Sequence, residues 1–543
     1  MKLRSFLFIT NFILFNCDLA AQVAVPKGDD ISYMGSGGKL NPLQAIMDIR
    51  HYTLALNVDI AQQSIDGYTT IDLLLLQKTD TLLFDLIHFY KVTKISVNNK
   101  GCSFYQQNDE IFITGNKGFK PGKQKVKIEY NGKPPVAVCP PWNGGFTWTK
   151  DSNGNPWVAI NCWQEGGKLY FPCKDHPSDE PNEGADLFIT VPAGLSVAAP
   201  GLLQSISKPE NNKQTFHWKT NYTISNYCIL FNIAKYKVYS SVYTTINGNK
   251  VPIQFYVLEA DTAQGAHVLE IRARDCRILE KYFGEYPWIK EKMGIAYVPN
   301  PGMEHQTMIS YGDKYTFKKV NGQDYSDNLY HEFGHEWWAN KVTNKDWAHM
   351  WIQEGINTYA EALFFREEAG ERAYDSVINI FKRKVKNEKP VVQGDEVNTK
   401  DIYTGDIYVK GAFFMHTLRY LTGDEVFFTT LKKLATDSMY TYNNFVTTDD
   451  VEKLFSKESG KNLKPLFDFY LRTTNVLEVS VVNTGFHEYA LEFKNMIVDV
   501  FPIDVMTDTG IQHLMIDKKK IKIKSAFPPV IDPDGHYLKK VIE

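Results

Sequence analysis

The sequence HEFGH at residues 331–335 is followed by WIQEG at residues 351–355, and these two stretches decide how the middle of the chain folds. The first stretch lies in a segment, 325–341, whose pattern predicts one helix. On that helix His331 and His335 lie one turn apart on the same face, because residues four positions apart are neighbours on a helix surface. Two imidazole side chains are therefore predicted to bind one ion.

Glu354 is the candidate for a third ligand. It lies at the start of a second predicted helix, 354–369, which the loop 343–350 connects to the first. Two antiparallel helices joined by a short connection can bring such a residue against the first helix. Zinc prefers nitrogen, sulfur and carboxylate ligands, and a catalytic zinc ion has three protein ligands and one open position for water. The sequence therefore predicts one Zn2+ per chain, bound by His331, His335 and Glu354.

Glu332 is adjacent to the first predicted ligand. Its carboxylate can lie beside the ion without binding it, in a position to take a proton from a water molecule as the general base. Two histidines spaced in this way, with a glutamate after the first, are a known signature of zinc hydrolases. The competing interpretation is an ordinary amphipathic helix in which Trp337 and Trp338 anchor the core.

Residues 1–21 have the pattern of an export signal peptide. A charged amino end precedes a short apolar run at 6–15, and cleavage is predicted after Ala21. Cys17 offers the alternative of a lipoprotein anchor, although the residue before it does not fit that motif. No later stretch is apolar enough for a membrane helix. We therefore expect an exported protein, periplasmic or secreted, with no stable membrane span.

Length and composition are those of a large globular enzyme. The chain has 543 residues, 43% of them hydrophobic, and such a length corresponds to roughly three domains. The net charge of -3 gives no electrostatic reason to expect nucleic acid as a partner. Six cysteines follow Cys17, and their spacing matches no zinc ribbon.

The fold class predicted from periodicity is α+β with several domains. Residues 22–240 form the first, an antiparallel β-sheet domain, because short alternating runs are separated by turn residues. Its strands are predicted at 52–58, 67–75, 92–97, 110–114, 123–130 and 186–191.

Helical periodicity dominates the second predicted domain, 241–475. It includes a helix at 267–283 and strands at 251–259, 293–297 and 307–311. The remainder, 476–543, is a small β-rich domain with strands predicted at 477–482, 489–494, 496–501 and 520–524. It is small for an independent domain, so we expect it to pack on the catalytic part.

Two further groups of residues in the helical region carry chemistry. Glu304, in the extended sequence PGMEH at 301–305, could receive a cation beside a zinc site, and in a peptidase this cation would be the α-amine of the substrate. Tyr408 opens a predicted helix that runs to residue 421, and a phenol hydroxyl can stabilise the oxyanion of a tetrahedral intermediate. Taken alone, such a glutamate is equally often a solvated residue in a turn, and any one of the 30 tyrosines is most often a core or surface residue.

The combination of motifs resembles the aminopeptidase N family of zinc aminopeptidases, the gluzincins that also include leukotriene hydrolase. Four elements occur in the order of that family: Gly-Met-Glu at 302–304, the zinc motif at 331–335, Trp-x-x-Glu-Gly at 351–355 and Tyr-x-Lys-Gly at 408–411. The similarity covers roughly residues 45–475. It implies a thermolysin-like, mainly helical catalytic domain.

The resemblance also implies a role for each matching residue. Zinc would be bound by His331, His335 and Glu354, Glu332 would be the general base, and Tyr408 would stabilise the oxyanion. The substrate would be bound by the Gly-Met-Glu element, with Glu304 on the α-amine beside Gly302 and Met303. The implied partners are peptides with a free amino terminus. The enzyme would be a hydrolase, an aminopeptidase among the metalloproteases.

Three positions depart from the family pattern. Pro301 and His305 replace the flanking residues of Gly-x-Met-Glu-Asn, and Trp163 stands where the amino-terminal loop usually has Gln. The next two residues, Gln164 and Glu165, are therefore the candidates there for amine binding. The large helical carboxy-terminal domain common in the family has no counterpart, which would leave the site more open. An endopeptidase, an epoxide hydrolase on the same scaffold and a silent peptide-binding protein are the alternative hypotheses.

Overall fold

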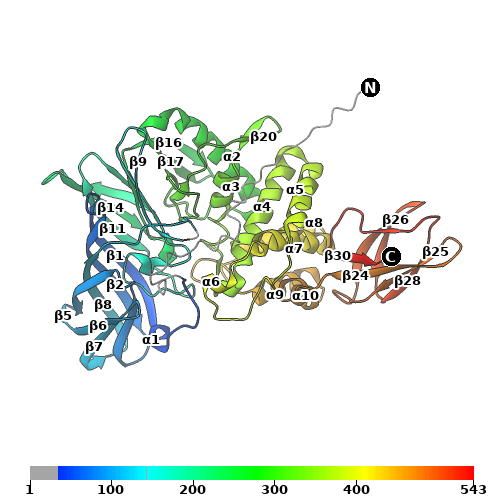
Figure 1. Ribbon diagram of the computed structural model, residues 1–543, viewed down its shortest axis with the longest axis horizontal. Helices are drawn as coiled ribbons and strands as arrows, with labels where there is room; N and C mark the ends of the chain where they lie inside the picture. Colours follow the sequence, from blue (N-terminus) through cyan, green and yellow to red (C-terminus); the bar gives the residue numbers. More distant parts are fainter. Residues whose placement is uncertain (1–34, 142, 543) are drawn as a thin grey trace.

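The computed structural model describes residues 35–141 and 143–542. Three units follow one another along its long axis: a β-rich amino-terminal unit in blue and cyan, a mainly helical middle unit, and a small red and orange β unit (Figure 1). The predicted signal peptide, with Cys17 inside it, lies outside the described residues. Within them, every helix is too short or too polar to span a bilayer.

The amino-terminal unit is built on an eight-stranded sheet with the order β13-β14-β11-β1-β2-β8-β4-β5. Along β1, Leu54, Leu56 and Val58 are buried and alternate with partly exposed residues, as expected of a strand with one face in the core. The predicted strands are confirmed, but β1 and β11 pair in parallel, so the sheet is not purely antiparallel. The strands are β1 (Met47–Asp59), β2 (Ser64–Leu75), β4 (Tyr90–Val97), β5 (Lys100–Gly101), β8 (Gly122–Gly132), β11 (Ala185–Pro192), β13 (Leu202–Ile206) and β14 (Lys213–Thr220).

Two smaller sheets and one short helix complete this unit. One sheet contains β3 (Thr79–Asp85), β6 (Ser103–Gln107) and β7 (Glu110–Phe119); the other contains β9 (Gly145–Lys150), β10 (Pro156–Asn161), β12 (Ser196–Ala198) and β15 (Asn232–Ala234); the helix is α1 (Pro42–Ala45). The second sheet matters for the site, because the loop that carries Trp163, Gln164 and Glu165 directly follows β10.

The middle unit combines a four-stranded sheet, β16-β17-β18-β19, with a cluster of helices. The predicted boundary at 240 falls inside β16, which pairs along its length with β17. The elements are β16 (Tyr236–Thr244), β17 (Lys250–Leu258), α2 (Gly265–Phe283), β18 (Met293–Tyr297), β19 (Ile309–Tyr311), β20 (Lys318–Val320), β21 (Gln323–Tyr325), α3 (Asp327–Gly334), β22 (Thr343–Asn344), α4 (Trp351–Ala369), α5 (Glu371–Lys384), α6 (Thr399–Ile402), α7 (Asp406–Thr422), α8 (Asp424–Thr436), β23 (Phe445–Val446), α9 (Thr448–Ser459) and α10 (Lys464–Leu471).

The first motif helix is shorter than predicted. The prediction of one helix over 325–341 is wrong, because α3 ends at Gly334 and the chain continues in tight turns. Backbone hydrogen bonds from Asn340 N to the His335 carbonyl at 3.0 Å and from Val342 N to the Trp337 carbonyl at 2.9 Å replace the helical pattern. Trp337 and Trp338 lie in these turns, and both rings are fully buried. The turn brings the Trp337 indole N–H to the Gly284 carbonyl, 3.1 Å away.

The carboxy-terminal unit consists of two small sheets, β28-β25-β24-β30 and β27-β26-β29. It packs on the middle unit as expected: Thr417 Oγ1 on α7 donates to the His536 carbonyl at 2.7 Å, and Tyr470 OH donates to the Leu538 carbonyl at 3.1 Å. The strands are β24 (Leu477–Gly485), β25 (Glu488–Phe493), β26 (Phe501–Thr507), β27 (Gly510–Ile516), β28 (Lys520–Lys524), β29 (Val530–Ile531) and β30 (Lys539–Ile542).

The strand predicted at 496–501 is also wrong, because this segment is irregular and β26 begins only at Phe501. Ile497 and Val498 are nevertheless buried, so the apolar run belongs to the core without forming a strand. Asn495 holds the loop by accepting from Glu478 N at 3.2 Å and donating to the Val476 carbonyl at 3.1 Å. Side-chain bonds of this kind compete with strand pairing.

Candidate metal centre and substrate site

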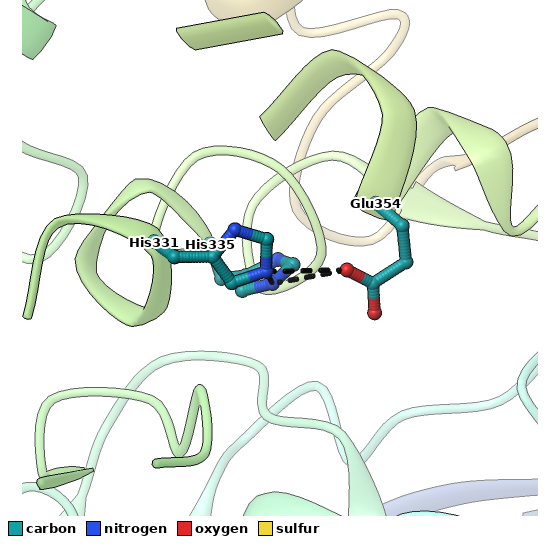
Figure 2. Close-up of side chains that lie close together, drawn as sticks. All are labelled: His331, His335 and Glu354. Carbon is teal, nitrogen blue, oxygen red and sulfur yellow. Dashed lines mark hydrogen bonds and ion pairs between the residues drawn. The ribbon is translucent and has the colours of Figure 1, made fainter. Parts of the chain in front are cut away.

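The three predicted ligands come together where α3 ends and α4 begins. The Nε2 atoms of His331 and His335 are 3.1 Å apart, and each lies 3.4 Å from Glu354 Oε2, as Figure 2 shows. Three ligands of a tetrahedral zinc ion, at bond lengths of about 2.0–2.2 Å, lie about 3.3–3.5 Å from one another. Glu354 Oε2 is buried and has no hydrogen-bond partner. These residues therefore fit a zinc ion.

The protonation of the ligands also suits a metal. His331 Nδ1 lies 2.8 Å from Glu361 Oε1, and His335 Nδ1 lies 2.7 Å from the Trp338 carbonyl. Both partners are acceptors, so each Nδ1 carries a proton and each Nε2 is left for the ion. Burial raises the pKa of Glu354, but the two histidines lower it to about 2. Burial lowers the pKa of both rings, but the neighbouring carboxylates raise it above its usual value. A metal ion that binds here therefore displaces the Nε2 protons and meets two neutral nitrogens and one carboxylate.

Glu361 is expected to be needed for full metal affinity, because its carboxylate orients the ring of His331. Replacing it with Ala should weaken zinc binding about 10- to 100-fold, the usual cost of removing such a partner. Competition against a chromophoric chelator measures the dissociation constant. Glu388→Ala is the matched control, since Glu388 is exposed. A zinc affinity within twofold of the wild type would show that Glu361 does not orient the ligand.

Glu332 lies next to the predicted zinc ligands, but it is not one of the three residues that form the predicted zinc site. One carboxylate oxygen accepts a hydrogen bond from Asn328 Nδ2 at 3.1 Å, which holds the side chain along the helix. Carboxylate atoms of Glu332 and Glu304 and a ring nitrogen of His335 lie within 4.8 Å of one another. Burial raises the pKa of Glu332 to about 8. A carboxyl group in this setting can accept and return a proton.

Glu304 follows a residue that pairs with strand β19, and its carboxylate lies close to Glu332 and His335. Met303 exchanges two backbone hydrogen bonds with Ser310, of 3.2 and 2.9 Å, so the edge pairing does not use Pro301. Gly302 is needed here, because a Cβ atom would collide with the Asn328 side chain. The Glu304 carboxylate is buried and accepts from Tyr227 OH at 2.9 Å. Burial raises its pKa.

His305 turns into the interior instead of toward the site. It is fully buried, and its Nδ1 lies 3.0 Å from Ser310 Oγ. Burial lowers the pKa of His305 to about 3, so the ring is neutral. The departures at Pro301 and His305 therefore leave the position of Glu304 intact.

Tyr408 is brought to the metal ligands by a close crossing of α4 and α7. A Cβ on Gly355 would lie 2.8 Å from the Cα of Gly411, so both glycines are needed for the helices to approach so closely. The Tyr408 ring stacks on His331 with 6.1 Å between the ring centres. Its hydroxyl lies 2.8 Å from that of Tyr403. Tyr408 can therefore donate a hydrogen bond to a group bound at the ligands.

The amino-terminal loop contributes one aromatic side chain, Trp163, to the surroundings of the site. The Trp163 ring packs edge-on against Tyr403, with centres 5.2 Å apart, and against Trp347. The backbone carbonyl of Gln164 accepts from Thr399 Oγ1 at 2.8 Å. Glu165 is fully buried and accepts from the backbone N–H of Gly144 at 2.8 Å. The contacts of Glu165 are those of a loop anchor, and amine binding by Gln164 or Glu165 stays a prediction.

Four polar residues that sequence reasoning missed support this site: Asn328, Glu361, Tyr227 and Tyr403. Two of them had a local signal, because Asn328 lies one helical turn before Glu332 and Glu361 lies two turns after Glu354. Tyr227 had none, since it meets Glu304 only through the packing of two domains.

Family models match both the amino-terminal unit and the middle unit. A model of the peptidase M1 N-terminal domain matches residues 49–228, and a model of the peptidase family M1 domain matches residues 268–470. Tricorn protease-interacting factor F2 of Thermoplasma acidophilum is 22% identical over 82% of this chain and 57% of its own length. Aminopeptidase M1-D of Oryza sativa is 22% identical over 85% of this chain and 53% of its own. The chain thus spans about half the length of these curated relatives.

A solved structure shares the fold over most of its length. The M1 zinc metallopeptidase from Deinococcus radiodurans, in a mutant form bound to a Tyr-Ser-Ala substrate, aligns with a TM-score of 0.65 and 22% identity. The alignment covers 79% of this chain and 94% of that one. The fold over most of this chain is therefore one that occurs in a known metallopeptidase.

Proposed function

Because the chain belongs to peptidase family M1, the family of aminopeptidase N, we propose that it is a zinc-dependent aminopeptidase that removes the amino-terminal residue from peptides. The observation that carries this proposal is the position of Glu304. Its buried carboxylate lies close to Glu332 and His335, so an ammonium group bound there would lie within one residue of the metal ligands. That spacing favours cleavage after the first residue.

The roles of the side chains follow from what each can donate or accept. His331, His335 and Glu354 would hold the zinc ion, which when bound lowers the pKa of water and polarises a carbonyl. Glu332 would take the proton of the attacking water and pass it to the leaving amine. Tyr408 would donate its O–H to the carbonyl oxygen as negative charge develops there. Glu304 would pair with the α-ammonium of the substrate.

The proposal is tested with matched fluorogenic peptides that have either a free or an acetylated amino terminus. We expect hydrolysis of the free-amine peptides only, loss of activity with a zinc chelator and recovery when zinc is added. Comparable rates on the blocked peptides would indicate an endopeptidase instead. A protein that binds zinc but cleaves neither set would be a silent member of the family. A panel of amino-acyl substrates then gives the side-chain preference.

We further propose that the protein is exported, to the periplasm or outside the cell. The charged start, the apolar run at 6–15 and the small residues Ala20 and Ala21 support this. Amino-terminal sequencing of the protein from its native source is expected to begin at Gln22. An intact Met1 in a cytoplasmic fraction would contradict export.

A further inference from the structure

Tyr408 does not stand alone at the metal ligands, because a second phenol lies next to it. The hydroxyl oxygens of Tyr403 and Tyr408 are 2.8 Å apart, a normal hydrogen-bond length for two hydroxyl groups. We propose that Tyr403 is a positioning residue that aims the hydroxyl proton of Tyr408 at the reacting carbonyl oxygen. The inference rests on the proposed aminopeptidase function and extends it to a residue five positions earlier in the chain.

The direction of this hydrogen bond follows from the number of protons. A phenol has one O–H donor and also accepts. If Tyr408 donates to a substrate oxygen, its only proton is used, and Tyr403 must then be the donor between the two. Tyr403 thus fixes the rotation of the Tyr408 hydroxyl and leaves its proton free for the substrate. Donation into the Tyr408 oxygen also polarises that O–H, which makes it a better donor.

Tyr403 is suited to this role because it is anchored apart from helix α7. Its ring packs edge-on against Trp163 at an interplanar angle of 76°, and its backbone N–H donates to the Thr399 carbonyl at 3.3 Å. Thr399 Oγ1 in turn donates to the Gln164 carbonyl and accepts from Ser36 N at 3.0 Å. Segments from three parts of the chain therefore hold Tyr403 against the amino-terminal domain.

The packing around Tyr403 also gives Trp163 a structural role. A tryptophan stands where the amino-terminal loop of the family usually has Gln, and its ring packs edge-on against Tyr403. The loop thereby contributes to the geometry of Tyr408 through the packing of the Trp163 ring on Tyr403.

Three variants test the proposal, each removing only a hydroxyl group: Tyr403→Phe, Tyr408→Phe and the double variant. Loss of one neutral hydrogen bond corresponds to about a three- to tenfold change, so Tyr403→Phe should lower kcat by this factor and leave KM within twofold. Tyr408→Phe should lower kcat about 100-fold or more, the usual cost of removing an oxyanion donor. In the double variant, loss of Tyr403 should have no further effect.

Each other outcome overturns the inference. An equal loss from Tyr403→Phe in both backgrounds would mean that it acts independently of Tyr408. A larger loss in the Tyr408→Phe background would mean that Tyr403 is itself a donor to the substrate. If the wild type cleaves free-amine peptides and kcat of Tyr403→Phe is within twofold of it, only the inference fails. If the wild type cleaves none of them, the proposed function fails.

A binding measurement separates positioning from general damage. Calorimetry should show that Tyr403→Phe weakens binding of a phosphinic dipeptide, which mimics the tetrahedral intermediate, about three- to tenfold. Binding of a free amino acid should not change. Tyr105→Phe, at a half-exposed position in the amino-terminal sheet, is the matched control. Equal weakening of both ligands would indicate a structural defect and overturn the proposal.

Discussion

Replacing Glu332 with Gln is expected to lower kcat by a factor on the order of 100 to 10,000, the usual contribution of a general base. The amide keeps the shape of the side chain and its contact with Asn328, but it can neither take nor return a proton. Because Glu332 lies outside the group of three ligand atoms, the variant should still bind one zinc ion per chain.

The measurement pairs steady-state kinetics on a free-amine peptide with the zinc content of the same preparation. Glu388→Gln, at an exposed position, is the control for loss of a carboxylate and should match the wild type. Loss of zinc from Glu332→Gln would make this residue a ligand instead of a base. A kcat within tenfold of the wild type, with zinc bound, would mean that another group moves the proton.

Glu304→Gln is expected to have the second large effect, a loss of about 30- to 4,000-fold in kcat/KM on free-amine peptides. Removing one partner of a buried charge pair costs about 2–5 kcal/mol, and each 1.4 kcal/mol is a factor of ten. The amide keeps an oxygen that can accept from Tyr227 OH, so the loss reports the missing charge. Tyr227→Phe removes only the hydrogen bond and should cost far less.

A pair of inhibitors shows whether the missing charge acts on the amine. An amino-acid hydroxamate carries the α-amine, and its deamino analogue has the same side chain without it. Glu304→Gln should weaken the first inhibitor strongly and leave the second within twofold. Equal weakening of both would assign Glu304 to the metal site, and no weakening of either would remove it from substrate binding.

Local patterns predicted most of the secondary structure. The strands at 293–297 and 520–524 have the predicted bounds, and α2 is two residues longer than expected at its start. The two errors lie at 337–338 and 497–498, where buried residues sit in turns and loops held by hydrogen bonds outside the regular pattern. Tertiary packing overrode the local pattern at both places.

The candidate site was predictable to the extent that spacing along the chain encodes it. His331, His335 and Glu354 were named from the sequence, because helix periodicity sets two of them on one face and a short connection returns the third. The order of the Gly-Met-Glu, Trp-x-x-Glu-Gly and Tyr-x-Lys-Gly elements was likewise read directly from the sequence. Spacing along the chain did not predict the lengths of the turns or the directions of the side chains.

The sequence by itself determined the family and the candidates for metal ligands, base, amine site and oxyanion donor, because each depends on residue type and local spacing. Only the tertiary structure decided how they meet. The crossing at Gly355 and Gly411 sets Tyr408 over His331, and the packing of the amino-terminal domain brings Tyr227 to Glu304. Contacts between residues far apart in the chain depend on how whole elements pack, and no local pattern records that packing.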